Sequence, residues 1–124
     1  MSVVLWVVQI LIGLAFLGAG FLKVTKSREE LQPTMEWVED FSPGTVRFIG
    51  AMEVLAGVGL LLPSITGIAP VLTPVAAVGI VVLMVGATFT HVRRKEIVPN
   101  VVVTLALLAM AAFVAWGRFG PYAL

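Results

Sequence analysis

Four long apolar runs decide what this chain of 124 residues can fold into. They cover about residues 3–24, 44–62, 74–92 and 99–116, and each is near the roughly 20 residues that a helix needs to cross a hydrocarbon core. The chain is 60% hydrophobic and 12% charged, whereas soluble domains are about 25% charged. Because so few polar groups cannot cover a water-exposed surface, lipid must be the solvent. The sequence therefore predicts an all-α integral membrane protein, an antiparallel four-helix bundle.

Length and composition also exclude several classes of function. The chain is long enough for a single transmembrane domain, residues 1–124. A net charge of +1 without a basic stripe argues against a nucleic-acid partner. The absence of cysteine excludes thiol redox chemistry and iron–sulfur ligation. With one histidine and no cysteine, neither a haem with two histidine ligands nor a metal site is expected, since Glu53 and His91 alone fall short of a normal ligand set.

Residues 25–43 form the one segment with dense charge. Its apolar residues recur at helical spacing: Leu31, Met35, Trp37, Val38 and Phe41. Ser27 followed three residues later by Glu30 resembles a capping box. This pattern predicts an interfacial amphipathic helix, interrupted at Pro33, with Trp37 at headgroup level. Two readings of the role of this segment stay open. It is either a solvated connector that packs on the bundle or a lid over a functional site.

Prolines and glycines suggest where the spans begin and end. The second span is expected to begin near Pro43 and to end at Pro63, because proline does not easily continue a helix. Ser64–Thr73 then forms a short turn, and Pro99 suits the first turn of the fourth helix. The uncharged first run has no basic segment before it and is longer than the apolar region of a signal peptide, so it is read as a retained helix.

The basic residues predict an orientation. Arg118 stands alone on one side of the predicted bundle, and the other Lys and Arg residues fall on the opposite side. These are Lys23, Lys26, Arg28, Arg47, Arg93, Arg94 and Lys95. Because cytoplasmic loops carry the excess of Lys and Arg, both termini are expected outside the cytoplasm.

Each span carries one polar residue near the same predicted leaflet. Lys23 closes the first run, Glu53 sits inside the second, His91 closes the third and Asn100 opens the fourth. A charge at the centre of a membrane helix costs roughly 2.5–3.5 kcal/mol on insertion scales, so an intramembrane Glu indicates a functional site. The pattern predicts a polar pocket with a contribution from each helix, facing the cytoplasmic leaflet.

Two readings of Glu53 remain open. It is either a ligand-binding or proton-transfer group, or half of an ion pair with Lys23 or Arg47 that fixes the helix register. In the first reading Glu53 is a candidate catalytic residue, and Lys23 and Arg47 are candidate ligand-binding residues.

The remaining candidates come from the third and fourth spans. His91 carries an imidazole, a group that can act as an acid, a base or a hydrogen-bond donor, or it is an interfacial anchor. Asn100 and Thr104 are spaced i, i+4, so they either line the pocket or form ordinary hydrogen bonds between helices.

Several short motifs, taken together, resemble the DoxX-like membrane proteins. They are Phe16-Leu17-Gly18-Ala19-Gly20-Phe21-Leu22-Lys23, then Gly50-Ala51-Met52-Glu53 running on to Gly59-Leu60-Leu61-Leu62-Pro63, then Gly86-Ala87 with His91-Val92-Arg93-Arg94, and finally Asn100. The resemblance covers nearly the whole chain in the same order and spacing. On this resemblance Lys23, Glu53, His91 and Asn100 match the polar signature of the family.

The resemblance implies a small four-helix protein of the bacterial inner membrane. The family takes its name from a subunit of a thiosulfate:quinone oxidoreductase, which implies a quinone-like ligand and an oxidoreductase system. Since this chain has no cysteine, a redox role requires a quinone or a partner subunit. A homo-oligomer and a complex with a partner subunit both stay open.

The leading hypothesis is binding of a lipophilic, quinone-like ligand in the polar pocket. Glu53 would exchange protons, Lys23 would hold its charge state, and His91 and Asn100 would donate hydrogen bonds to a ligand oxygen. One alternative is a cofactor-free membrane enzyme, such as an isomerase, cyclase or hydrolase, with Glu53 and His91 as its acid/base pair. The other is a structural or assembly subunit of a membrane complex.

Overall fold

The computed structural model describes residues 2–31, 41–96 and 100–123. Within these residues five α-helices follow one another, with the following bounds: α1 Ser2–Thr25, α2 Arg28–Leu31, α3 Pro43–Thr66, α4 Leu72–Arg93 and α5 Val102–Phe119. All except the single-turn α2 are long and apolar enough to cross a membrane. The chain is therefore an all-α, multi-pass membrane protein, and this part of the sequence prediction is confirmed.

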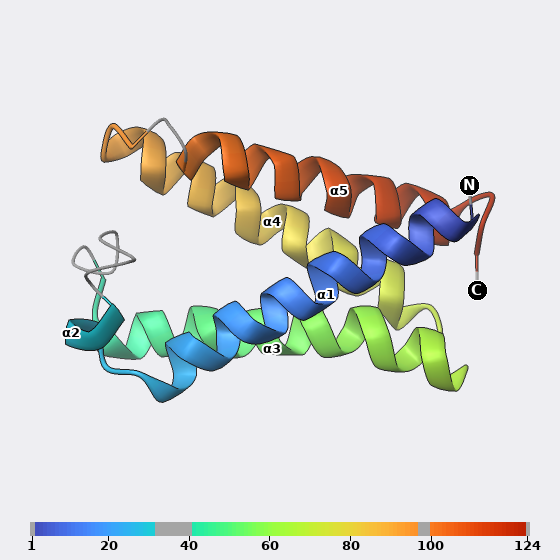
Figure 1. The fold of residues 1–124 in the computed structure, drawn as a ribbon, viewed down its shortest axis with the longest axis horizontal. Helices are drawn as coiled ribbons and strands as arrows, with labels where there is room; N and C mark the ends of the chain where they lie inside the picture. Colours follow the sequence, from blue (N-terminus) through green and yellow to red (C-terminus); the bar gives the residue numbers. More distant parts are fainter. Residues whose placement is uncertain (1, 32–40, 97–99, 124) are drawn as a thin grey trace.

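The long helices form two pairs. Figure 1 shows α1 beside α3 and α4 beside α5, with the two pairs close together at the end that holds the chain termini. Toward the other end, which holds α2 and the connection between α4 and α5, the pairs move apart. Apolar side chains from all four long helices fill the shared core; examples are Phe16, Leu60, Ile80 and Val114. The outward-facing residues are also apolar and exposed, as expected for a lipid-facing surface.

Glycines let α1 and α3 approach closely. A Cβ added at Gly20 would lie 2.5 Å from the carbonyl oxygen of Gly50, and one added at Gly57 would lie 2.8 Å from that of Gly13. The contacts recur at seven-residue intervals on each helix, which is two helical turns. Small residues at such positions allow the backbones of membrane helices to pack directly.

The expected end of the second span at Pro63 is wrong. The helix α3 continues to Thr66 and closes at Gly67, which has a φ of 73° and donates its backbone N–H to the Pro63 carbonyl. Proline has no N–H, so the Gly59 carbonyl lacks its usual donor in the helix. The Thr73 hydroxyl, from the start of α4, donates to that carbonyl at 3.1 Å. A side chain from the next helix thus compensates the proline, and the turn shortens to residues 67–71.

The predicted bounds of the fourth span also differ from those of the observed helix. The helix α5 covers Val102–Phe119 instead of 99–116, and Pro99 lies outside the described residues. At the second span, α3 begins at Pro43 as expected, with Ser42 as its cap.

The charged segment after α1 is described only in part. Ser27 and Glu30 form the predicted capping box, because each backbone N–H is bonded to the other side chain at 3.2 Å. The hydrogen bond from the Ser27 backbone N–H to the Glu30 carboxylate is the main cause that lowers the pKa of Glu30, and an interaction of the Ser27 hydroxyl with the same carboxylate lowers it further. Pro33 and Trp37 lie outside the described residues, so the interfacial helix over 25–43 stays a prediction.

Candidate functional site

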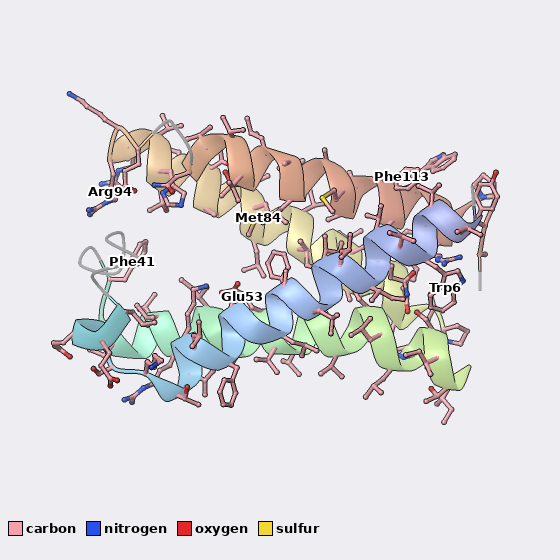
Figure 2. All side chains as sticks on the ribbon, in the orientation of Figure 1. Trp6, Phe41, Glu53, Met84, Arg94 and Phe113 are labelled. Atoms are coloured by element: carbon pink, nitrogen blue, oxygen red, sulfur yellow. The ribbon has the colours of Figure 1, made fainter. Side chains whose placement is uncertain are left out.

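A cavity of about 500 Å³ lies where the two helix pairs separate. Figure 2 shows Glu53 and Met84 on opposite sides of this space, and both line the cavity. Most of its wall is apolar. Its polar or ionisable side chains come from all four long helices: Lys23 from α1, Glu53 from α3, Thr90 and His91 from α4, and Thr104 from α5. Four of the six candidate residues from the sequence therefore meet at one cavity.

Lys23 and Glu53 form an ion pair in the cavity wall. The Lys23 Nζ lies 2.7 Å from Glu53 Oε1, and the two side chains are only 8% and 6% exposed. The glycine contacts explain the pairing, because a Cβ at Gly50 would lie 2.6 Å from the Lys23 Cβ. The lysine stem thus lies against Gly50, and its ammonium group reaches Glu53 one turn further along α3. A pair of opposite charges avoids the cost of one unpaired charge at this depth.

His91 is held at the end of α4 by a residue that the sequence reasoning missed. Its Nδ1 lies 2.8 Å from Glu96 Oε1, while Arg94 Nε donates to Glu96 Oε2 at 3.2 Å. Lys95 adopts a φ of 61°, and the Glu96 N–H bonds to the His91 carbonyl, so the turn brings Glu96 back beside the imidazole. The bond to His91 is the main cause that lowers the pKa of Glu96. With Nδ1 engaged, Nε2 is the ring nitrogen left for a ligand.

Thr104 and Asn100 do not act together as the i, i+4 spacing predicts. Thr104 is buried in the cavity wall, accepts a hydrogen bond from the Thr88 hydroxyl at 2.8 Å and donates to the Val101 carbonyl at 3.0 Å. Asn100 is half-buried and lines neither this cavity nor the second one described below. Residues 100 and 101 form a π-helical turn that leads into α5 at Val102, so the regular α-helical spacing does not hold between Asn100 and Thr104.

The cavity reaches the outside of the bundle. Ala15 on α1 and Val82 on α4 both line it and are both exposed, with Val82 66% exposed. Phe41 lines it at the end of the molecule near α2 (Figure 2). A molecule in this cavity would therefore contact both the lipid-facing surface and the membrane-surface end of the protein.

A second cavity, of about 200 Å³, lies at the junction of α1, α2 and α3. Its charged lining residues are Lys23, Lys26, Glu29 and Arg47. Arg47 thus belongs to this smaller cavity, while the ion pair with Glu53 is made by Lys23. Lys23 lines both cavities.

The opposite end of the bundle holds a buried polar cluster that the sequence reasoning also missed. The Gln9 side chain is fully buried, and its Nε2 donates to the Leu60 carbonyl at 2.6 Å and to the Ser64 hydroxyl at 2.5 Å. Ser64 in turn contacts the Thr73 hydroxyl at 2.7 Å. One strongly polar side chain inside an otherwise apolar run was the signal that could have predicted such a network.

Arg118 completes this cluster from α5. Its Nε donates to Gln9 Oε1 at 3.0 Å, its Nη1 donates to the Tyr122 carbonyl at 2.9 Å, and its guanidinium lies 4.9 Å from the ring centre of Trp6. Figure 2 shows Trp6 at this end, near the chain termini. We call Gln9, Ser64, Thr73 and Arg118 the terminal polar cluster. It joins α1, α3, α4 and α5 by hydrogen bonds.

The comparisons with known proteins identify one family. A family model described as the DoxX-like family matches residues 7–114, a stretch that contains every candidate residue from Lys23 to Thr104. No curated protein and no solved structure matches the chain.

Within the described residues, no group of three His, Cys, Asp or Glu side chains is placed to hold a metal ion.

Proposed function

The chain belongs to the DoxX-like family of membrane proteins, and we propose that it binds a lipophilic, quinone-like ligand in the cavity between its helix pairs. One observation carries the proposal: a mainly apolar cavity of about 500 Å³ has a buried ion pair and a histidine in its wall. Small-molecule sites commonly have this size, with an apolar lining and a few polar groups that fix the orientation of the ligand.

The ligand is proposed to enter from the bilayer. Ala15 and Val82 place part of the cavity rim on the lipid-facing surface. A molecule dissolved in the membrane reaches this rim without crossing water. The apolar lining then holds its ring or tail, while its polar oxygens lie toward Lys23 and Glu53.

The polar groups suggest how a ligand proton is handled. Glu53 is the proposed proton-exchanging group, and the ammonium group of Lys23 stabilises its carboxylate form at 2.7 Å. When Nδ1–H of a neutral His91 donates a hydrogen bond to Glu96, the imidazole carries a lone pair on Nε2. That nitrogen accepts a hydrogen bond from a ligand hydroxyl. A protonated imidazole instead donates one to a ligand carbonyl, so the same residue serves both the quinol and the quinone forms.

The cellular setting follows from the basic residues and from the lack of thiols. All Lys and Arg residues except Arg118 belong to segments at the end of the bundle where α2 lies (Figure 1). From the positive-inside rule we propose that this end faces the cytoplasm and that both termini lie outside it. The bacterial inner membrane is proposed from the resemblance to the family. With no cysteine, the chain would serve an oxidoreductase system through its ligand and a partner subunit or second copy.

A second candidate function is supported by the contact between His91 and Glu96. A carboxylate on Nδ1 orients an imidazole as a general base, and Glu53 offers a second acid/base group on the wall of the same cavity. This pair would suit a cofactor-free enzyme, such as an isomerase, cyclase or hydrolase, that acts on a lipophilic substrate.

The test is native mass spectrometry of the gently solubilised protein, followed by extraction and identification of any bound small molecule. The wild type is compared with Glu53→Gln, and Glu30→Gln is the matched control because Glu30 is exposed and lines neither cavity. Glutamine also suits the capping position of Glu30. We expect a stoichiometric lipophile in the wild type and the control, and at least about tenfold lower occupancy in Glu53→Gln, the loss of about 1.4 kcal/mol of binding free energy.

The other outcomes separate the alternatives. Conversion of the bound molecule without any electron acceptor would favour the cofactor-free enzyme. Proteins that are empty in all three forms, with Glu53→Gln merely less stable, would indicate that the ion pair only fixes the packing of α1 and α3 in a structural subunit.

A further inference from the structure

The smaller cavity has a wall with unmatched positive charge. It is lined by Lys26 from the end of α1, Arg47 from α3 and Glu29 from α2, together with Lys23. Glu53 already neutralises Lys23. The remaining lining charges are two positive and one negative, so the cavity carries a net charge of about +1 at neutral pH.

Among the described residues, neither Lys26 nor Arg47 has an ion-pair partner, although the charge of Lys26 acts on the carboxylate of Glu30. No ion pair or hydrogen bond joins the side chain of Lys26 or Arg47 to any residue that the structure describes. Both side chains are exposed at the cavity, in contrast to Arg118, which is buried and bonded to Gln9 and Tyr122. The cations are therefore available to an external anion.

The start of α3 adds to the positive potential at this cavity. Pro43, the first residue of this 24-residue helix, belongs to the lining, and the first turn contains no acidic residue. The helix dipole places partial positive charge at this end. The Thr45 N–H already donates to the Ser42 hydroxyl and is not left for a ligand. The helix dipole therefore only attracts an anion, and the side chains of Lys26 and Arg47 make the direct contacts with it.

The position of the cavity indicates which anion reaches it. It lies where α1 leaves the apolar core and α3 enters it, the depth at which lipid headgroups meet a membrane protein. Basic pockets between membrane helices are suited to anionic lipid headgroups, and Arg is suited to phosphate oxygens. We propose that this cavity binds the phosphate group of an anionic phospholipid, held by Lys26 and Arg47.

This site is separate from the proposed ligand function. Lys26 and Arg47, the two cations proposed to hold the phosphate, do not line the larger cavity, and Glu53 does not line the smaller one; Lys23 alone of the charged residues lines both. The variant Glu53→Gln should therefore lose the lipophile and keep the phospholipid, while variants of Arg47 should do the reverse. Failure of either proposal can be seen without the other.

The experiment is a titration of the detergent-solubilised full chain with dioleoylphosphatidylglycerol, read by native mass spectrometry. We expect Arg47→Gln and Lys26→Gln each to weaken binding about fivefold, the usual effect of one basic residue near a lipid headgroup. Glu29→Gln should tighten binding because it removes the one carboxylate of the lining. The matched control is Lys95→Gln, which removes an exposed cation from the same end of the bundle but lines neither cavity.

Two further probes identify the group that is recognised. Dioleoylglycerol, which has no phosphate, should bind weakly to the wild type, and Arg47→Lys should retain most of the phosphatidylglycerol affinity. Equal weakening by Lys95→Gln and Arg47→Gln would overturn the site, because it would show only diffuse surface charge. Displacement of the lipid by inorganic phosphate alone would overturn the lipid assignment and make free phosphate the ligand.

Discussion

The two ends of the bundle both bury polar side chains, but they use them differently. At the α2 end, Lys23 and Glu53 lie in the wall of a cavity of about 500 Å³, where a ligand can reach them. At the end with the termini, Gln9 is fully buried and both ends of its amide are bonded to protein groups. Arg118 there is bonded to Gln9 and to the Tyr122 carbonyl.

The difference teaches that an intramembrane polar residue is not by itself a functional residue. In lipid, helix association depends on packing and on hydrogen bonds between helices. The terminal polar cluster provides such bonds and holds the two helix pairs together at one end. With that end closed, the pairs are able to separate at the other, where the polar groups face a cavity. We therefore expect variants at the two ends to affect different properties.

The largest effect on stability is expected from Gln9→Leu. The substitution removes the acceptor of the Arg118 Nε–H inside the bundle, where Arg118 Nη2 already has no partner among the described residues. Loss of a buried hydrogen bond to a charged group, with the donor left unpaired, should reduce the free energy of unfolding by about 3 kcal/mol. Thermal unfolding in detergent, followed by circular dichroism, measures the change, and ligand occupancy at the cavity should stay near that of the wild type.

A double variant sharpens this prediction. Gln9→Leu with Arg118→Leu should be more stable than the sum of the two single variants predicts, because the buried charge is removed together with its partner. If Gln9→Leu instead removed the ligand from the cavity and left the free energy of unfolding unchanged, the proposed difference between the two ends would be wrong.

A smaller effect is expected from Thr73→Val, which keeps the shape of the side chain and removes its hydroxyl. The Gly59 carbonyl would lose the hydrogen bond that compensates for Pro63, at a cost of about 1 kcal/mol. In a Pro63→Ala background the cost should shrink, since the alanine N–H can bond to Gly59 within the helix. The measurement is a double-mutant cycle in thermal unfolding, and an equal cost in both backgrounds would show that Thr73 does not compensate for the proline.

The smallest effect is expected at the cavity end, from Glu96→Gln. Its bond to His91 lowers the pKa of Glu96 below the ordinary value of about 4.5. A carboxyl group with a lowered pKa stabilises the fold above its unfolded pKa and loses that contribution as the pH falls through the folded value. The wild type should therefore lose slightly more stability than Glu96→Gln between about pH 6 and about pH 3, by less than about 1 kcal/mol.

Thermal unfolding of both proteins across that range tests the pH dependence. Parallel curves would mean that Glu96 does not stabilise the connection between α4 and α5. His91 should also bind the proposed ligand less well in Glu96→Gln, because its imidazole is no longer held by a carboxylate at Nδ1.

The sequence by itself determined the features that depend on short stretches of chain. A run of about 20 apolar residues must be helical in lipid, because every backbone polar group has to be paired within its own segment. The capping box of Ser27 and Glu30 and the start of α3 at Pro43 are equally local, since they depend on residues one turn apart. The choice of Lys23, Glu53, His91 and Asn100 followed from single polar residues in apolar runs. The structure brings the first three to one cavity, together with Thr104, which was chosen for its spacing from Asn100.

Only the tertiary structure decided which helix faces meet. It selected Lys23 over Arg47 as the partner of Glu53 through the glycine contact of α1 with α3. It also extended α3 past Pro63, because Thr73 from the next helix supplies the missing donor. The hydropathy pattern could not predict these contacts, since lipid tails are as apolar as the side chains and leave no hydrophobic preference for one face. Close backbone approach and hydrogen bonds between helices then choose the partners, and both depend on residues far apart in the chain.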